Sequence, residues 1–88
     1  MAQKEVTVVN RLGLHARAAA RLVALASEFE CEIRLVRDGR EVNAKSIMGV
    51  MMLAAARGTR LRIVCRGPDE AEAVERLAAL IADGFGEE

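Results

Sequence analysis

The feature that most constrains the fold of this 88-residue chain is the spacing of its apolar residues, which alternates between a strand-like and a helix-like period along the sequence. In four short runs the apolar residues alternate with polar ones, which is typical of β-strands with one buried face. In three other segments they recur every three or four residues, as on the buried side of an α-helix. A chain of this length supports one hydrophobic core, so we expect a single domain over residues 1–88.

The four predicted strands cover residues 5–9, 31–37, 40–43 and 59–66. Asp38 and Gly39 separate the second strand from the third, and this dipeptide is typical of a two-residue hairpin turn. In the last strand Leu61, Ile63 and Cys65 share the expected inner face. The alternate positions of that strand are arginines, namely Arg60, Arg62 and Arg66. We therefore expect one face of the sheet to contact helices and the arginine-bearing face to contact solvent.

The first two predicted helices cover residues 16–27 and 47–58, and the third starts within residues 67–70. Ser46 is the expected N-cap of the short second helix. Residues 67–70 open the third helix, with Pro68 in its first turn, and Asp83 and Gly84 end it, leaving a short tail to Glu88. The order of elements is βαββαβα. This order predicts an α/β fold of the α+β type, a two-layer open-faced sandwich.

Composition argues against nucleic acid and membrane partners. Thirteen basic and thirteen acidic residues give a net charge of zero, and two phenylalanines are the only aromatic residues. Binding of RNA or single-stranded DNA by base stacking needs more aromatic faces, so the outward arginines are better explained as a solvated sheet face. No apolar run approaches the length of a membrane span, and no signal segment is evident. We expect a cytoplasmic location.

The cysteines and the histidine indicate no metal site. Cys31 and Cys65 each fall in an alternating strand pattern, which favours two buried free thiols, although the sequence leaves a disulfide between them open. The chain has one histidine and no close Cys/His spacing, so a zinc site is not expected. No cofactor is expected either.

His15 stands where a loop turns into the first predicted helix. Gly13 before it favours a turn, and the alanine-rich run after it favours a helix. A helix that begins near Ala16 places His15 beside the backbone N–H groups of Ala16 and Arg17, at the positive end of the helix dipole. Phosphate binds well at such a position, and the Arg17 guanidinium can contact two phosphate oxygens.

A neutral imidazole is a competent nucleophile at neutral pH, so this pattern predicts that His15 accepts and donates a phosphoryl group. On these residues alone, a surface or capping histidine is the alternative. The sequence offers no general base, metal site or substrate pocket. We therefore expect a phosphoryl carrier rather than a complete enzyme.

The segment after Ser46 combines a helix cap with exposed apolar residues. Phosphorylation of Ser46 would place a dianion at a helix start, where the dipole favours it, and Lys45 offers a counter-charge. A short helix cannot bury all of its sides. We therefore expect part of the group Ile47, Met48 and Met51 to be exposed, which suits a surface that accepts several partners.

Two motifs together resemble the HPr family, the histidine-containing phosphocarriers of the bacterial phosphoenolpyruvate-dependent sugar phosphotransferase system. They are Gly13-Leu14-His15-Ala16-Arg17 and Lys45-Ser46-Ile47-Met48-Gly49-Val50-Met51. The resemblance extends over the whole chain in length and element order. It implies a four-stranded antiparallel sheet in the order 1-4-2-3 with three helices on one face.

The resemblance also implies the chemistry. His15 would take a phosphoryl group on Nδ1 from phosphorylated Enzyme I and pass it to an EIIA domain, with Arg17 pairing with the phosphate. Ser46 corresponds to the serine that the ATP-dependent HPr kinase/phosphorylase modifies. That modification weakens transfer from Enzyme I and can create a surface for transcriptional regulators. Partners would dock around the first two helices, at Ile47, Met48 and Met51, on a monomer.

The chain departs from the family at one position, because Ala18 stands where the family usually has proline. Proline would stiffen the first helical turn. Its absence is therefore expected to make this turn less stable, by up to about 1 kcal/mol. One alternative function stays open, a mainly regulatory phosphoprotein of an incomplete or nitrogen-related phosphotransferase branch. A small-molecule-binding regulatory domain would need a ligand pocket, and the sequence shows no cluster of polar residues that would line one.

Overall fold

Four antiparallel strands form one sheet in the computed structural model of the chain, which describes residues 1–87. The strands are β1 (Ala2–Thr7), β2 (Glu32–Arg37), β3 (Arg40–Asn43) and β4 (Arg60–Arg66). The sheet order is β1-β4-β2-β3, so the first strand pairs with the last and not with its neighbour in sequence. The order confirms the one expected from the family resemblance.

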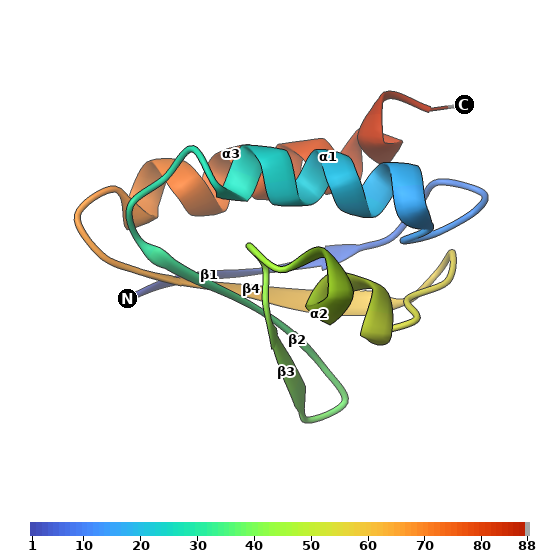
Figure 1. The fold of residues 1–88 in the computed structure, drawn as a ribbon, viewed down its shortest axis with the longest axis horizontal. Coiled ribbons are helices and arrows are strands. Elements are labelled where there is room, and N and C mark those ends of the chain that lie inside the picture. The colour runs from blue at the N-terminus through green and yellow to red at the C-terminus, as the bar shows by residue number, and fades with distance from the viewer. Residues whose placement is uncertain (88) are drawn as a thin grey trace.

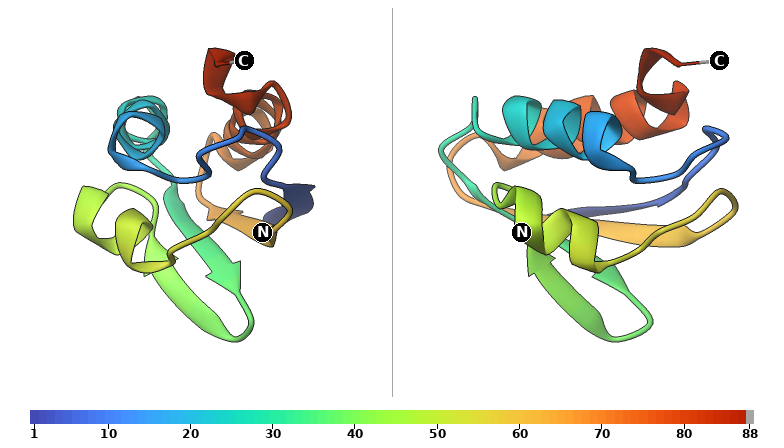
Figure 2. Two further views of the ribbon diagram at one scale, coloured as in Figure 1. Left: turned by 90° about the vertical axis from the view of Figure 1, so that its right-hand side faces the viewer. Right: turned by 45° about the vertical axis from the view of Figure 1, so that its right-hand side comes forward.

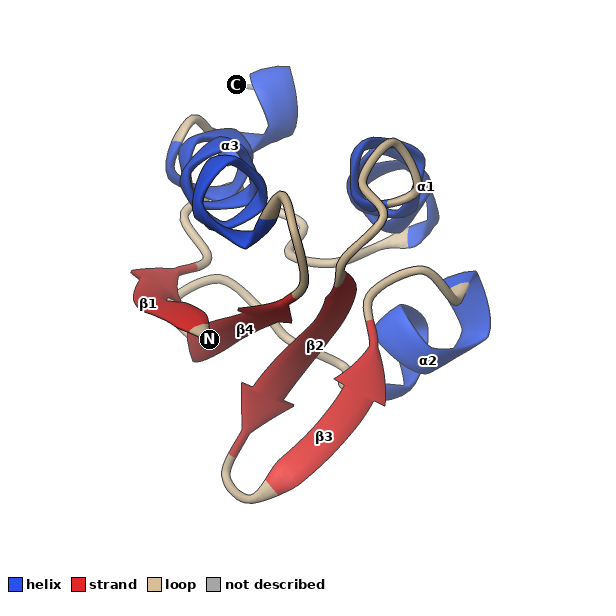
Figure 3. Ribbon diagram, turned by 90° about the vertical axis from the view of Figure 1, so that its left-hand side faces the viewer, coloured by secondary structure: helices blue, strands red, loops and turns tan. Residues whose placement is uncertain are grey.

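The helices form the second layer. They are α1 (Ala16–Ala26), α2 (Ile47–Met52) and α3 (Glu70–Ala82), followed by a short 3₁₀ turn, η1 (Gly84–Gly86). Helices α1 and α3 lie side by side across one face of the sheet (Figures 1 and 2). Helix α2 packs against α1 and β3 at the edge of this layer (Figure 3). The βαββαβα sandwich is thus confirmed, and no helix within residues 1–87 covers its other face.

Alternation along β4 decides which face is buried. Leu61, Ile63 and Cys65 are buried beneath the helices, whereas the three arginines between and beside them are exposed. Helices α1 and α3 contribute the facing side chains, among them Leu22, Leu77 and Ile81. The small residues Ala18, Ala19, Ala73 and Ala78 are also buried in the helix layer.

Two predicted boundaries are wrong by several residues. Strand β1 covers Ala2–Thr7 instead of residues 5–9, because its polar N-terminal half pairs with β4 as an edge strand. Helix α2 ends at Met52 instead of continuing to Gly58. The chain turns at Ala54, whose φ is 51°, and the carbonyl of Ala55 then accepts a hydrogen bond from the Leu14 N–H at 2.9 Å. A contact with a distant loop therefore stops the helix.

Residues 84–87, which we call the C-terminal hook, were expected to be a tail. They fold back because three consecutive residues adopt left-handed backbone conformations, with φ of 70° at Gly84, 60° at Phe85 and 73° at Gly86. Glycine adopts this conformation readily, but phenylalanine does so only when packing enforces it. Phe85 is fully buried, and its carbonyl oxygen accepts a hydrogen bond from the Arg21 guanidinium of α1.

Asp69 connects the start of α3 to the loop before β2. Its carboxylate accepts hydrogen bonds from the backbone N–H groups of Glu30, at 2.8 Å, and Cys31, at 3.0 Å. The bond from Glu30 is the main reason why the pKa of Asp69 lies below its ordinary value.

Cys31 and Cys65 are buried free thiols, as predicted, and burial raises the pKa of Cys31 to about 12. A thiol of such high pKa is not reactive at neutral pH.

Candidate functional site

His15 is the N-cap residue of α1. Its backbone is extended, with φ −74° and ψ 178°, and its carbonyl accepts the first helical hydrogen bond, from the Ala19 N–H at 2.8 Å. The imidazole makes no capping hydrogen bond, so it leaves the first N–H groups of the helix without a side-chain acceptor. The ring is half-buried. The predicted position of His15 at the N-terminus of the first helix is therefore confirmed.

Gly13 holds the loop before His15 against the segment that follows α2. Its φ is +67°, and a Cβ atom there would lie 2.4 Å from the carbonyl oxygen of Ala55 and 2.9 Å from Cα of Ala56. The neighbouring Leu14 N–H donates to that same Ala55 oxygen at 2.9 Å. Only glycine permits this close approach of two backbone segments, and the contact fixes the position of His15.

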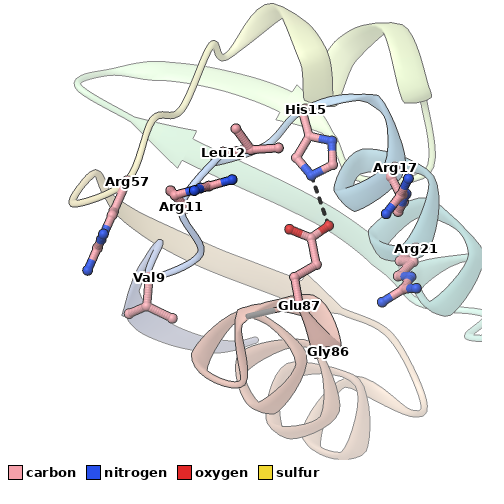
Figure 4. A pocket seen from close by; sticks show the side chains of 9 residues that line it. All are labelled: Val9, Arg11, Leu12, His15, Arg17, Arg21, Arg57, Gly86 and Glu87. Atoms are coloured by element: carbon pink, nitrogen blue, oxygen red, sulfur yellow. Dashed lines mark hydrogen bonds and ion pairs between the residues drawn. The ribbon is translucent and has the colours of Figure 1, made fainter.

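An open pocket surrounds the His15 ring (Figure 4). Four arginines line it, together with one carboxylate and a few apolar side chains. The lining residues are Val9, Arg11, Leu12, His15, Arg17, Arg21, Arg57, Gly86 and Glu87. The excess of guanidinium groups makes this pocket suitable for an anion, and phosphate is an anion that guanidinium groups bind in two-point fashion. The predicted pair of His15 and Arg17 is brought together here.

Glu87 of the C-terminal hook reaches into this pocket and contacts the histidine. Its Oε2 lies 2.8 Å from Nε2 of His15, and its Oε1 accepts a hydrogen bond from Nδ2 of Asn10 at 3.2 Å. The same Nδ2 donates to the carbonyl of Gly13 at 2.8 Å. Burial opposes ionisation of Glu87, but the hydrogen bonds from Asn10 and His15 and the nearby Arg17 charge outweigh it and lower its pKa.

Sequence reasoning missed Glu87, Asn10 and Arg21 as parts of this site. Asn10 is a turn residue by its type, and nothing local shows that it is buried. The signal that could have revealed Glu87 is Phe85. A large apolar residue between two glycines rarely belongs to a free tail, and packing it into the core brings the next residues back over the helices.

Ser46 is the N-cap of α2, as predicted. Its Oγ accepts a hydrogen bond from the Gly49 N–H at 3.1 Å, and the side chain is half-buried. The Lys45 ammonium donates a hydrogen bond to the carbonyl of Phe29 at 2.6 Å. Its predicted role as a counter-charge to a phosphate on Ser46 stays a prediction.

Four apolar side chains of α2 are exposed. Ile47 and Met51 are each 42% exposed, Met48 is 69% exposed and Met52 is 60% exposed. Val50 and Leu53, by contrast, are fully buried. The segment is divided between core and exposed residues, as expected, but all three of Ile47, Met48 and Met51 are exposed instead of part of them. Exposed apolar side chains on a small protein are typical of a docking surface.

Two further observations concern residues 1–87. These residues contain no group of three or more His, Cys, Asp or Glu side chains that could hold a metal ion. None of the helices in this described part combines the length and the apolar character that a membrane crossing requires.

The sequence matches a family model described as "PTS HPr component phosphorylation site" over residues 2–83. It is 54% identical over 87 residues to the phosphocarrier protein HPr of Cupriavidus necator, covering 99% of this chain and 98% of that protein. It is 51% identical to the phosphocarrier protein HPr of Treponema pallidum, with both chains covered completely.

Solved structures agree with the sequence comparison. HPr of Thermoanaerobacter tengcongensis superposes with a TM-score of 0.97 at 43% identity, covering 100% of this chain and 99% of that one. HPr of Bacillus anthracis gives 0.88 at 46% identity, covering 91% and 95%. Together with the family model, these similarities show that the chain belongs to the HPr family, the phosphocarriers of the phosphotransferase system.

Proposed function

We propose that His15 is the residue of this phosphocarrier that carries the phosphoryl group, and that it does so on Nδ1. The observation that carries the proposal is the position of the ring, at the open N-terminus of α1 and inside a pocket lined by four arginines. The chain is a component of the phosphotransferase system and not a complete enzyme. Phosphorylated Enzyme I is the proposed donor, and an EIIA domain is the proposed acceptor.

In the proposed transfer, the Nδ1 lone pair of His15 forms a bond to phosphorus while the bond between phosphorus and the donor group on Enzyme I breaks. The Arg17 guanidinium and the N–H groups of Ala16 and Arg17 bind the phosphoryl oxygens. These groups oppose the negative charge and orient the phosphorus towards the ring. The same contacts serve in reverse when the group leaves for EIIA.

Replacing His15 with alanine is expected to abolish labelling. Wild-type protein incubated with Enzyme I and radiolabelled phosphoenolpyruvate should gain a phosphate that is labile in acid and stable in base. The His15→Ala protein should gain none, because the only imidazole of the chain is gone. Label that persists in His15→Ala would contradict the proposal. Circular dichroism of both proteins checks that the variant is folded.

Ser46 is the proposed regulatory site, modified by an ATP-dependent HPr kinase/phosphorylase. A phosphate on its Oγ would lie at the start of α2, next to the exposed apolar side chains on that helix. Three of these, Ile47, Met48 and Met51, are the proposed contacts for Enzyme I and EIIA. A dianion beside them would change the charge of the docking surface without unfolding the helix. The proposed carrier is a monomer and is located in the cytoplasm. Transcriptional regulators are further proposed partners of its Ser46-phosphorylated form.

The kinase is expected to place an acid-stable phosphate on wild-type protein but not on Ser46→Ala. Loss of the N-cap should also lower the free energy of unfolding of Ser46→Ala by about 1 kcal/mol. Ser46→Thr keeps a capping hydroxyl and is the matched control for stability, measured by urea denaturation. Acid-stable phosphate on Ser46→Ala, or an unchanged rate of transfer from Enzyme I after modification of Ser46, would contradict the regulatory role.

A further inference from the structure

The contact between Glu87 and His15 is built by the fold and is not a chance pair of surface side chains. The C-terminal hook that carries Glu87 is anchored by the fully buried Phe85 and by the hydrogen bond from Arg21 to its carbonyl. The Glu87 side chain is 16% exposed and that of His15 is 27% exposed. Asn10 donates a second hydrogen bond to the carboxylate and so holds it in place.

This contact decides which ring nitrogen of His15 carries the proton. A neutral imidazole has one N–H and one lone pair, and an ionised carboxylate can only accept. With Oε2 of Glu87 2.8 Å from Nε2, the favoured tautomer carries its proton on Nε2. Nδ1 then keeps its lone pair. The four charged side chains that line the same pocket with Glu87 are arginines, which have no acceptor to offer the Nε2 proton.

We propose that Glu87 is a positioning residue for phosphoryl transfer, which fixes His15 in the Nε2–H tautomer and opposes the positive charge that develops on the ring. The proposal rests on the proposed function of His15. As Nδ1 bonds to phosphorus and the donor's bond to phosphorus breaks, the Nε2 proton stays on the ring, and the imidazole gains positive charge. A carboxylate hydrogen-bonded to the opposite nitrogen stabilises that charge, as the aspartate of a catalytic triad does.

The test combines a rate with a spectroscopic readout of the ring. We expect Glu87→Gln to accept phosphate from Enzyme I about tenfold more slowly than wild type, because the charged partner of the ring is lost. Glu87→Asp should recover part of the rate. Glu41→Gln is the matched control, because Glu41 is an exposed glutamate of β3 outside the pocket. It should react at the wild-type rate.

The ¹⁵N spectrum of the His15 ring above the titration range of histidine reports the tautomer directly. Wild type and Glu41→Gln should show a protonated Nε2 and an unprotonated Nδ1. Glu87→Ala, which has no side-chain acceptor for the Nε2 proton, should shift both signals towards their average. An unchanged tautomer in Glu87→Ala, or an unchanged rate in Glu87→Gln, would overturn the proposal. If His15→Ala takes up label, or wild type takes up none, it is the proposed function that fails, since those results do not depend on Glu87.

Discussion

Replacing Phe85 with alanine is expected to lower the free energy of unfolding by about 3–5 kcal/mol, which is the usual cost of emptying a buried phenylalanine site. Phe85 is fully buried and is the largest side chain of the core to be so. It also belongs to the C-terminal hook, which has no other large apolar side chain. Urea denaturation of both proteins measures the loss.

The same substitution is expected to slow phosphorylation of His15 about as much as Glu87→Gln does, because an unanchored hook no longer holds Glu87 at the ring. Phe29→Ala is the matched control. Phe29 is also buried, with 6% exposed, but it follows the far end of α1 and contacts Arg76 instead of the site. Phe29→Ala should therefore lose stability and keep its rate. Equal rates in the two variants would contradict the role of the hook.

The second large effect is expected at Gly13. Gly13→Ala should lower the free energy of unfolding by about 2–5 kcal/mol, the sum of a strained backbone and an overpacked contact. The new Cβ would lie 2.4 Å from the carbonyl oxygen of Ala55, so the loop before His15 must move away. We therefore expect slower phosphoryl acceptance as well as lower stability, measured by urea denaturation and by labelling through Enzyme I.

Gly39→Ala separates the two causes. Gly39 also has a positive φ, +81°, but no atom lies within 4 Å of the position of its Cβ. Its replacement should cost only the backbone strain, about 1 kcal/mol, and should leave the labelling rate unchanged. If Gly13→Ala and Gly39→Ala lost equal stability, the close contact with Ala55 would not be what makes Gly13 necessary.

Much of the fold could be predicted because the local signals agree with one another. The alternation in β4, the Asp38-Gly39 turn and the cap at Ser46 are each readable from a few neighbouring residues, and each is confirmed. The order of the strands could not come from such signals. It came from the family resemblance, since pairing of β1 with β4 is a property of the whole chain.

Only the site residues that lie close together in the sequence could be predicted. His15 and Arg17 follow from a loop that turns into a helix, and both line the pocket. Glu87 lies 72 residues further along the chain and reaches the site through the C-terminal hook. The hook depends on a left-handed backbone at Phe85, which the residue preferences of phenylalanine do not predict. The end of α2 was mispredicted for a similar reason, because the Ala55 carbonyl bonds to Leu14 instead of continuing a helix.

The sheet order also bears on when this protein folds during its synthesis. Ala2 lies opposite Cys65, so β1 has no strand to pair with until β4 has been made. At about 5–20 residues per second, the first strand waits roughly 3–13 s for its partner. A loop of residues 8–14 joins β1 to His15, and this loop is held by Ala55 and Glu87, which are translated after α1. A partly synthesised chain would therefore hold His15, the proposed phosphoryl acceptor, only in an unassembled site.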